Sequence, residues 1–358
     1  MKFQKILSAA ALVLLPVMAG AATVVVPAAG TGPGANGSQW QSELTLHSSA
    51  PRVVTVSLTL HQGKGAGTPV DVTLQPRETL SIADVLKTRF GVSSGTGAIV
   101  IGVADRDAKA LAVTSRTFNV SPLGELGQDI PAYAVTADPR AGAILALTGP
   151  SRVADARFNA GLFSVTASTV KWELVRANGT IAATKELSYA AGEQVQYNAA
   201  VEALFAAAPQ NNDTIYARIR SGNVVAYGSA INNASGDPSF VPSVLTRDDI
   251  LIQLLGVDLD ENGTIDVADA DGDGTLDAPI DLVTSSFPNY FRLVARGEFG
   301  EPVTLEVLAS QSGVDLLDAN GTVRVTAYGD LKNTSGTITF RGTAAGTSAV
   351  LTIPVRYK

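Results

Sequence analysis

The acidic residues of this 358-residue chain are concentrated in one segment, between Asp248 and Asp281. This segment holds 11 of the 33 aspartates and glutamates and no lysine or arginine, which leaves 22 acidic against 26 basic residues elsewhere. Carboxylates at such density repel one another unless a cation neutralises them. The sequence has no basic cluster of the kind that binds nucleic acid, so the charge pattern predicts a cation as the partner.

The spacing of these acidic side chains indicates which cation the segment would bind. Residues 258 to 269 read DLDENGTIDVAD, with oxygen-bearing side chains at Asp258, Asp260 and Asn262 and a glycine directly after them. In a 12-residue calcium loop, alternate side chains supply oxygen ligands and a glycine at position 6 permits the sharp turn. Asp269 stands at position 12, where glutamate is usual, and begins a second series whose glycine lies 11 residues after the first.

The sequence therefore predicts one calcium ion and allows a second. Thr264 would contribute its backbone carbonyl, Asp269 would be shared by the two loops, and Asp281 would close the second loop. The predicted metal ligands are Asp258, Asp260, Asn262, Thr264, Asp266, Asp269, Asp271, Asp273, Thr275, Asp277 and Asp281. A solvated acidic linker without an ion is the alternative interpretation, but the repeated spacing of the glycines favours calcium.

The first loop resembles a dockerin loop, which also ends in aspartate, and the second series resembles a thrombospondin type 3 repeat. Both resemblances imply calcium as the ligand. A dockerin also has a helix between its loops, and this sequence has none that fits. Bound calcium would fold the segment and stiffen the junction between domains. Extracellular loops of this kind bind at about 10⁻⁴ to 10⁻³ M, so the gain in millimolar calcium is about 1 kcal/mol per ion.

The first two-thirds of the chain contain an internal repeat with an offset of about 113 to 118 residues. Trp40 corresponds to Phe158, and Asn119 corresponds to Asn232. In both copies apolar and polar residues alternate, which predicts half-buried antiparallel strands. Such strands, separated by glycine, asparagine and proline turns, predict an all-β fold with two duplicated β-sandwich domains.

The first copy is expected over residues 23–130 and the second over residues 131–246, each with one short helix. Ser81 would cap the first helix and Gly91 would end it, whereas Asn198 would cap the second. A further β-sandwich, immunoglobulin- or cadherin-like, is expected over residues 282–358. The calcium segment, residues 247–281, is either a linker or an insertion in this last domain, whose first strand would then be residues 250 to 255.

Two motifs carry a resemblance to a known group of proteins. The first copy contains VPAAG…NGSQWQSELTLHS and the second contains VVAYGSAINNASGDPSFVP. They resemble tandem β-sandwich modules of uncharacterised exported bacterial proteins, and the resemblance covers both copies of the repeat. It implies a location and an architecture, and no established activity.

Residues 1–22 predict a cleaved signal peptide. Lys2 and Lys5 precede a short apolar run, and Ala19 to Ala21 offers a small-residue cleavage site. An apolar run of about ten residues cannot cross a ~30 Å hydrocarbon layer, and no later segment is long enough, so no membrane span is expected. The chain has no cysteine, so packing or bound ions must hold it together. We expect a secreted, extracellular or cell-surface protein, with the periplasm as an alternative.

Two motifs match catalytic patterns without the context that catalysis requires. Residues 91 to 95 fit the GxSxG nucleophile pattern, which needs a strand before the serine and a helix after it. The predicted order is the reverse, a helix followed by a strand. Residues 32 to 37 fit GxGxxG, but a strand follows instead of the helix that a dinucleotide site requires. Both motifs are interpreted as loops.

The remaining candidates for acid–base chemistry are few. Asp105 and Asp107 form a carboxylate pair of the type that glycosidases use, but a hairpin turn is the simpler interpretation. His47 and His61 both end strands, which predicts surface imidazoles. No catalytic residue and no organic cofactor is predicted, and the chain is expected not to be an enzyme.

These observations favour an exported, non-enzymatic, calcium-binding structural or adhesion protein, whose partner is an extracellular protein or a glycan. The alternative is an accessory carbohydrate- or protein-binding module that acts beside secreted hydrolases. A cluster of exposed aromatic side chains on one sheet face would favour that alternative. The candidates are Trp40, Trp172, Tyr189, Tyr197, Tyr216 and Tyr227, with core packing as the simpler expectation for the two tryptophans.

Overall fold

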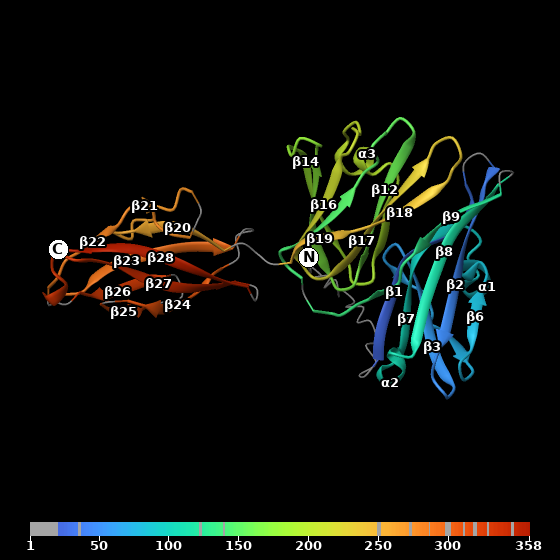
Figure 1. Ribbon diagram of the computed structural model, residues 1–358, viewed down its shortest axis with the longest axis horizontal. Coiled ribbons are helices and arrows are strands. Elements are labelled where there is room, and N and C mark those ends of the chain that lie inside the picture. Colours follow the sequence, from blue (N-terminus) through green and yellow to red (C-terminus); the bar gives the residue numbers. More distant parts are fainter. Residues whose placement is uncertain are drawn as a thin grey trace, which may run out of the picture. The chain divides into compact units, whose positions relative to one another are not determined.

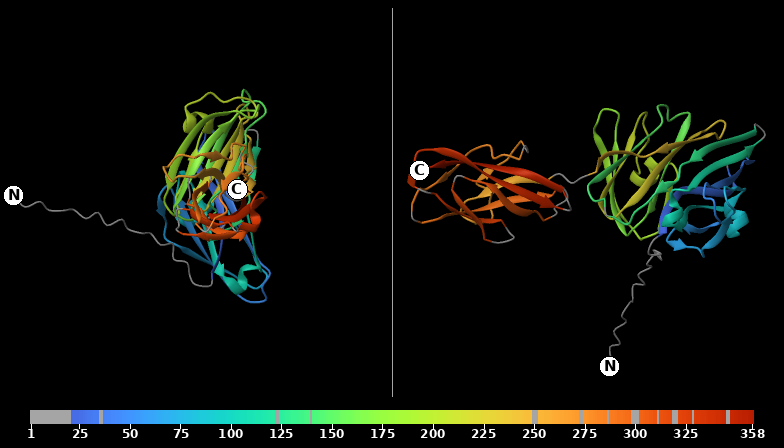
Figure 2. Two further views of the ribbon diagram at one scale, coloured as in Figure 1. Left: turned by 90° about the vertical axis from the view of Figure 1, so that its left-hand side faces the viewer. Right: turned by 60° about the horizontal axis from the view of Figure 1, so that its bottom comes forward.

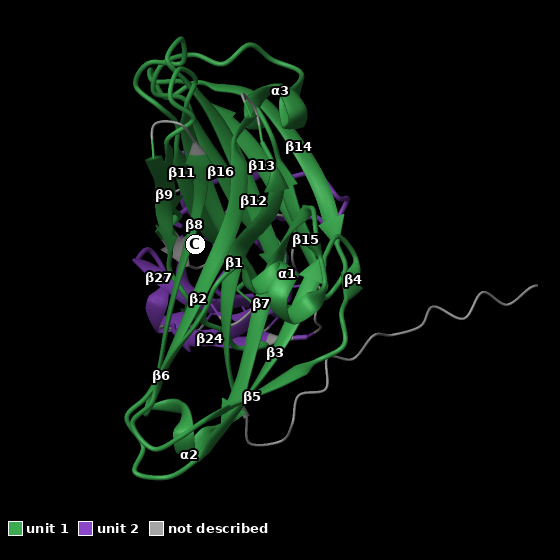
Figure 3. Cartoon of the chain, turned by 90° about the vertical axis from the view of Figure 1, so that its right-hand side faces the viewer, with its two compact units in different colours: residues 1–247 green, residues 248–358 purple. Residues whose placement is uncertain are grey.

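The computed structural model describes residues 21–34, 37–121, 124–138, 140–248, 252–271, 274–285, 287–297, 302–310, 312–317, 321–327, 329–344 and 347–358. Nearly all of its regular elements are strands (Figures 1 and 2), which confirms the all-β fold class. The chain divides into two compact units (Figure 3). Residues 1–247 are named the N-terminal unit and residues 248–358 the C-terminal unit.

Residues 1–20 of the predicted signal peptide lie outside the described residues. Ala21 and Ala22, the last two residues of that prediction, begin strand β1 (Ala21–Pro33) and pair with β7 (Gly95–Ala104). Within the part of the chain that the structure describes, no helix has the length and apolar character needed to cross a membrane.

The first copy of the repeat is a β-sandwich. In one sheet β5, β3, β7 and β1 pair in that order, and in the other β6, β2, β8 and β9 do so. β1 shifts register between Val26 and Ala29, and its last residues pair with β2, so this strand crosses from one sheet to the other. The remaining strands of this copy are β2 (Gln39–Ser48), β3 (Val54–Gln62), β4 (Gly65–Ala66), β5 (Val70–Leu74), β6 (Thr79–Ile82), β8 (Leu111–Ser121), β9 (Gly124–Ile130) and β10 (Tyr133–Ala134).

The core of the first copy follows from the alternation in its strands. In β3, Val54, Val56 and Leu58 are buried, whereas the residues between them are exposed or half-buried. They share one core with Leu44 and Leu46 of the opposite sheet. Burial of apolar side chains from both inner faces is what holds two sheets of a sandwich together.

The second copy repeats this topology. Its first sheet has the order β14, β13, β16, β11, β19, where β19 lies beside β11 as β10 lies beside β1 in the first copy, and its second sheet has the order β15, β12, β17, β18. Each strand thus takes the place of a strand in the first copy, which confirms the duplication that the sequence predicts. The strands are β11 (Ala143–Thr148), β12 (Ala156–Ser164), β13 (Ser168–Val175), β14 (Ile181–Tyr189), β15 (Gln194–Tyr197), β16 (Thr214–Ser221), β17 (Val224–Asn232), β18 (Pro238–Pro242) and β19 (Val244–Asp248).

One short helix occupies the same place in each copy: α1 (Val85–Phe90) in the first and α3 (Ala200–Phe205) in the second. Gly91 ends α1 with a left-handed conformation (φ 68°), as predicted. The predicted caps are wrong, because the residues that precede the two helices are Asp84 and Ala199. Ser81 cannot cap α1, since it lies within β6 and its hydroxyl bonds the hydroxyl of Thr45.

A further helix was not expected from the sequence. Residues 105–108 form the short helix α2 (Asp105–Ala108) between β7 and β8, where a hairpin turn was predicted. The prediction of a turn rested on polar composition alone, which a single helical turn shares with a loop.

The C-terminal unit is a third sandwich with a single core. One sheet has the order β21, β20, β23, β26, β25, and the other has the order β22, β28, β27, β24. Phe291, Phe340 and Tyr357 are among its largest buried side chains. The elements are β20 (Ile252–Asp258), β21 (Val267–Ala268), β22 (Ile280–Leu282), β23 (Asn289–Gly297), β24 (Thr304–Ala309), β25 (Gly313–Leu316), β26 (Thr322–Thr326), a 3-10 helix (Gly329–Leu331), β27 (Ser335–Ala344) and β28 (Thr347–Tyr357).

The acidic segment is an insertion in this sandwich. Two strands of the sandwich lie at least partly within residues 247–281: β20 pairs with β23, and β22 pairs with β28. The two acidic loops are therefore inserted between β20 and β22. Leu276 and Ile280, which lie in the segment, are buried in the core of the unit. Of the two arrangements that the sequence allows, the structure therefore has the insertion.

Candidate metal centre

The first acidic loop connects two paired strands. Val257 of β20 pairs with Val267 of β21, and residues 259–266 form the connection. Gly256 makes this hairpin possible, because a Cβ atom there would lie 2.3 Å from the carbonyl oxygen of Val267. Its φ of 150° also belongs to the range that favours glycine. The loop is thus held between strands, and not between the helices of a helix-loop-helix calcium site.

Three aspartates of this loop converge. Asp258, Asp260 and Asp266 each place a carboxylate oxygen within 4.8 Å of the others. Asp258 is buried and accepts hydrogen bonds from the backbone N–H groups of Asn262 (3.1 Å) and Gly263 (2.8 Å). Asp266 accepts one from the backbone of Leu259 at 2.7 Å. These bonds orient the carboxylates toward a common point.

The second loop repeats the first position by position. Asp269, Asp271 and Asp277 form the second cluster, again with oxygens within 4.8 Å of one another. Asp269 accepts from the backbone of Gly274 at 2.9 Å, which matches the bond between Gly263 and Asp258. Asp277 accepts from the backbone of Ala270 at 2.9 Å, which matches the bond between Leu259 and Asp266.

The backbone repeats as well as the side chains. The N–H of Asp266 donates to Val257 at 2.9 Å, and the N–H of Asp277 donates to Ala268 at 3.1 Å, so this bond too has its equivalent in the second loop. Two separate loops with the same internal bonds are the geometry of a duplicated ligand cradle.

The carboxylate of Asp258 is held in its charged form. Burial pushes its pKa upward, but hydrogen bonds from the backbone of Gly263 and Asn262 outweigh this effect and lower the pKa below its usual value. Each cluster therefore offers carboxylate oxygens at close range to a cation. Calcium, a hard cation that takes six to eight oxygens at about 2.3–2.6 Å, fits this donor set.

Several predicted ligands do not join a cluster in this conformation. Asp269 belongs to the second cluster alone and is not shared with the first. The side-chain oxygen of Asn262 accepts from the backbone of Thr264 at 2.8 Å, within its own turn. Asp281 lies in β22 and forms ion pairs with Arg356 and Lys358.

Thr275 and Asp273 are also not among the described members of either cluster. Thr275 forms an isolated bridge with Thr352 of β28, which fastens the second loop to the sandwich. Asp273 lies outside the described residues. The clusters thus comprise six of the predicted side chains, at the first, third and ninth positions of each loop.

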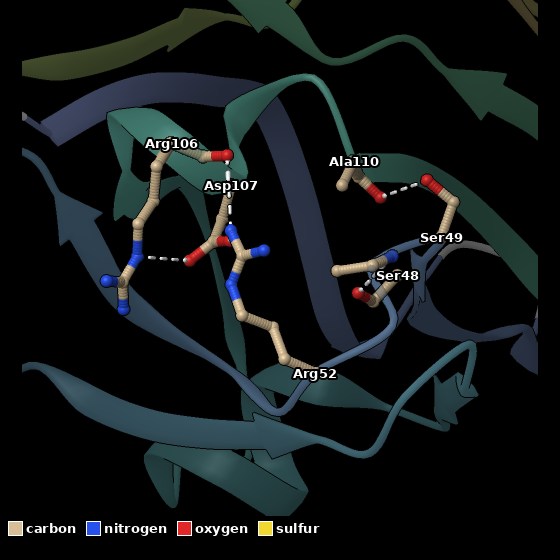
Figure 4. A network of polar contacts seen from close by, with 7 residues as sticks. Ser48, Ser49, Arg52, Arg106, Asp107 and Ala110 are labelled. Atoms are coloured by element: carbon tan, nitrogen blue, oxygen red, sulfur yellow. Dashed lines mark hydrogen bonds and ion pairs between the residues drawn. The ribbon is translucent and has the colours of Figure 1, made fainter.

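The carboxylate pair considered for catalysis is not available as a pair. Asp107 is buried at the end of α2, where the guanidinium groups of Arg52 and Arg106 both contact its carboxylate (Figure 4). Asp105, two residues away, is exposed. Figure 4 shows that Arg52 reaches Asp107 from a different segment, so the ion pair ties α2 to the loop that follows β2.

Neither glycine motif has the order of elements that its catalytic pattern requires, but the prediction of plain loops is wrong in part, because Gly95 begins β7 and Gly32 lies near the end of β1. Gly91 caps the C-terminus of α1, and β7 follows it, which is the reverse of the order that a nucleophile turn requires. Gly32 lies in β1, and β2 follows the second motif instead of a helix. Two residues of that motif, Ala35 and Asn36, lie outside the described residues.

His61 contradicts the expectation of a surface imidazole. It is only 1% exposed, and its ring lies edge-on against Phe163 of the second copy at a centroid distance of 5.3 Å. Its Nδ1 bonds the carbonyl oxygen of Gly192 at 2.9 Å, whereas Nε2 is buried without a partner among the described residues. The sequence could not show this, because the burial comes from contact between the two copies.

Three of the six aromatic candidates are buried, and the other three are half-buried. Trp172 is fully buried and donates to the hydroxyl of Tyr189 at 2.7 Å, which confirms core packing for this tryptophan. Tyr227 is also buried, at 1% exposure. Trp40 differs, since it is half-buried at the start of β2 and lines a cavity.

No protein-family model matches the sequence, and no curated protein matches it. Among solved structures, an endo-fucoidan hydrolase from glycoside hydrolase family 107 aligns with 73% of this chain and 36% of its own, at 12% identity and a TM-score of 0.20. Immunoglobulin domains 1–5 of Sidekick-1 align with 88% of this chain and 60% of their own, at 9% identity and a TM-score of 0.20. Immunoglobulin domains 1–4 of Sidekick-1 align with 86% of this chain and 70% of their own, at 10% identity and a TM-score of 0.19. Scores this low assign neither a family nor an activity.

Proposed function

We propose that this chain is an exported, non-enzymatic, calcium-binding protein with a structural or adhesive role. The observation that carries the proposal is the pair of aspartate clusters, which repeat the same hydrogen bonds in two successive loops. Clustered carboxylate oxygens are the ligands that a hard cation such as calcium prefers, and here two such clusters follow one another between strands. A chain built of three β-sandwiches suits adhesion or assembly.

The position of the loops indicates where calcium would act. Leu276 follows the second cluster, is buried in the core, and donates from its backbone to Thr352 at 3.1 Å. Thr352 in turn donates to Gly274 at 2.8 Å. An ion that pulls the carboxylates together would therefore stabilise the C-terminal unit itself. The sequence led us to expect that calcium stiffens the junction between domains. Because the loops lie within the last sandwich, we propose instead that calcium stabilises that sandwich.

Calcium titration of the chain from Ala21 onward, followed by calorimetry, tests the proposal. We expect dissociation constants of about 10⁻⁴ to 10⁻³ M, as in other extracellular calcium modules. Replacing Asp258 and Asp266 together by asparagine should weaken one site by at least about tenfold, because two anionic ligands are lost. Asn retains the shape of the side chain, so the loop keeps most of its hydrogen bonds.

The matched control is Asp330→Asn, which removes an exposed carboxylate of the same unit outside both clusters. Its calcium titration should equal that of the parent. If calcium releases no heat and leaves the thermal midpoint unchanged, or if the double variant binds as tightly as the parent, the metal-binding function is refuted.

A second candidate function is glycan binding, in keeping with the alternative of an accessory module. One observation favours it: a cavity in the N-terminal unit is lined by Trp40, Arg157 and several amide side chains. This cavity is formed by the two copies alone and involves neither aspartate cluster, so the two functions are independent.

A further inference from the structure

The cavity lies between the two copies of the N-terminal unit. The first copy contributes the end of β1, Trp40 of β2 and Gln128 of β9. The second copy contributes Asn159 of β12 and Tyr227 of β17, among others. Its volume of about 390 Å³ falls in the range of small-molecule sites. Neither copy could build the cavity alone.

The walls of the cavity are held in place by direct contacts between the copies. Val25 and Ala98 of the first copy form a small buried cluster with Phe163 and Val165 of the second. The backbone of Gln194 donates to Gly63 at 2.8 Å. At the cavity itself, Ser229 donates to the side-chain oxygen of Gln128 at 3.0 Å. The site is therefore preformed, which reduces the ordering cost of binding.

Amide groups line the cavity with hydrogen-bond donors. Asn159 is buried (5% exposed), and its side-chain oxygen accepts from the backbone N–H of Ala199 at 3.1 Å, so its NH₂ group has no partner among the described residues. Asn159 lines the cavity, so this NH₂ group is available to a ligand there. The amide oxygen of Gln128 is likewise engaged by Ser229.

A chain of hydrogen bonds positions a further amide. Tyr227 donates to the side-chain oxygen of Gln196 at 3.2 Å, and Gln196 donates to that of Asn198 at 2.9 Å. Tyr227 is fixed over Gly161, where a Cβ atom would lie 2.1 Å from its ring. The NH₂ group of Asn198 is left as a donor without a described partner. Three amides thus present NH₂ groups to a ligand that must offer acceptors.

The cavity also has a positive charge without a matching negative one. Arg157 lines it and contacts Asn233 only weakly, at 3.4 Å, and it forms no ion pair with any described carboxylate. No aspartate or glutamate is among the described residues that line the cavity. A guanidinium group of this kind binds a carboxylate through charge-assisted hydrogen bonds.

Trp40 adds an apolar surface at the rim. It is half-buried, whereas Trp172, the second of the two tryptophans in the chain, is fully buried in the core of the second copy. The apolar face of a sugar ring can pack against the aromatic ring of Trp40. The hydroxyl oxygens at the edge of the sugar can accept hydrogen bonds from the neighbouring amide groups.

We propose that the cavity between the two copies binds an acidic carbohydrate, a short oligosaccharide that contains uronic acid. Its carboxylate pairs with Arg157, its hydroxyl and ring oxygens accept from the amides of Gln128, Asn159 and Asn198, and one ring packs against Trp40. This inference deepens the second candidate function, on which it rests, and is independent of calcium binding.

Fluorescence titration with trigalacturonate tests the proposal, with the neutral sugar maltotriose as the comparison. Because Trp172 is inaccessible, any change in tryptophan emission reports Trp40. We expect trigalacturonate to alter the emission and to bind at least about tenfold more tightly than maltotriose, since one charge-assisted bond is lost with the neutral sugar. Trp40→Phe should abolish the emission change.

Arg157→Gln should weaken trigalacturonate binding by at least about tenfold and leave maltotriose binding unchanged. The matched control is Arg152→Gln, an exposed arginine of the same copy that pairs with Asp155 and does not line the cavity. Calorimetry measures the affinity of Trp40→Phe, which has lost the fluorescence signal. Each variant must have the same circular dichroism spectrum as the parent, which shows that it is folded.

The outcomes separate this inference from the function on which it rests. Equal binding of the two sugars, or unchanged binding in Arg157→Gln, overturns the acidic specificity and leaves glycan binding in place. Equal binding of glutarate, an anion without a sugar ring, overturns the carbohydrate assignment. If none of these probes binds, both the inference and the glycan function are refuted.

Discussion

At the scale of single residues, His61 is the group whose charge the fold controls most directly. Burial between the two copies lowers its pKa below the usual value of about 6.5, and the hydrogen bond to Gly192 opposes this shift without reversing it. The imidazole is therefore neutral in the folded protein near neutral pH. Its Nε2 has no described partner that could accept a proton from a charged ring.

We expect His61 to make the N-terminal unit less stable as the pH falls. The unfolded chain takes up a proton below about pH 6.5, whereas the folded protein does so only at a lower pH, so the free energy of unfolding decreases between these two values. The slope is at most about 1.4 kcal/mol per pH unit for one proton. Urea unfolding measured at several pH values between about 5 and 7.5 gives this slope.

His61→Gln should remove this slope, because glutamine carries no titrating group and can still donate to Gly192. His47→Gln is the control, since it also removes a histidine of the first copy and leaves His61 intact. If His61→Gln keeps the full slope of the parent, the stability of the unit is not linked to His61.

At the scale of elements, the hairpin of β20 and β21 determines the geometry of the first aspartate cluster. Asp258 is the last residue of β20, and Asp266 directly precedes β21. Register between these two strands therefore decides whether their carboxylates converge. Gly256 permits that register, because it pairs with Ala268 of β21 and a Cβ atom there would lie 2.3 Å from the carbonyl oxygen of Val267.

We expect Gly256→Ala to destabilise the C-terminal unit by about 1–3 kcal/mol, since the added Cβ would clash with backbone and the positive φ would be strained. Calcium affinity should fall as well, because the loop is displaced. Gly329→Ala is the control, as no atom lies within 4 Å of the added Cβ. Thermal unfolding by circular dichroism distinguishes the two. Equal midpoints for both variants would show that the close approach at Gly256 is not needed.

At the scale of the whole molecule, the cores of the two units share no residues. The N-terminal unit contains the cores of the two copies and the small cluster between them, and the C-terminal unit contains a core of its own. Both aspartate clusters lie in the C-terminal unit. Calcium should therefore act on the stability of one unit and not on that of the other.

Two probes can follow the units separately in the intact chain. Both tryptophans lie in the N-terminal unit, so tryptophan emission follows its unfolding, whereas far-ultraviolet circular dichroism follows both units. At about 10 mM calcium we expect the C-terminal unit to gain about 1.4–2.7 kcal/mol per bound ion. The dichroism transition should shift upward and the tryptophan transition should not. A calcium shift in tryptophan emission would contradict this separation.

Local patterns in the sequence were sufficient for much of the architecture. Alternation with period two places Val54, Val56 and Leu58 on one face wherever that strand is paired, so the strands and the duplication could be predicted. The acidic loops were also readable, because the ligands and the glycine of each loop are close neighbours in the chain. The helix caps could not be predicted in this way. Asp84, the residue before α1, makes no side-chain cap bond, and its carboxylate instead accepts from the hydroxyl of Thr31, which is distant in the sequence.

Contacts between distant segments could not be inferred from those patterns. The burial of His61, the insertion of the two acidic loops between β20 and β22, and the cavity that joins Trp40 to Arg157 all depend on which surfaces meet. Alternation shows that a side chain faces inward or outward from its own sheet, but it carries no information on what covers the outer face. The sequence alone thus determined the strands and the spacing of the acidic side chains, whereas only the tertiary structure decided which of those side chains converge and what lies between the copies.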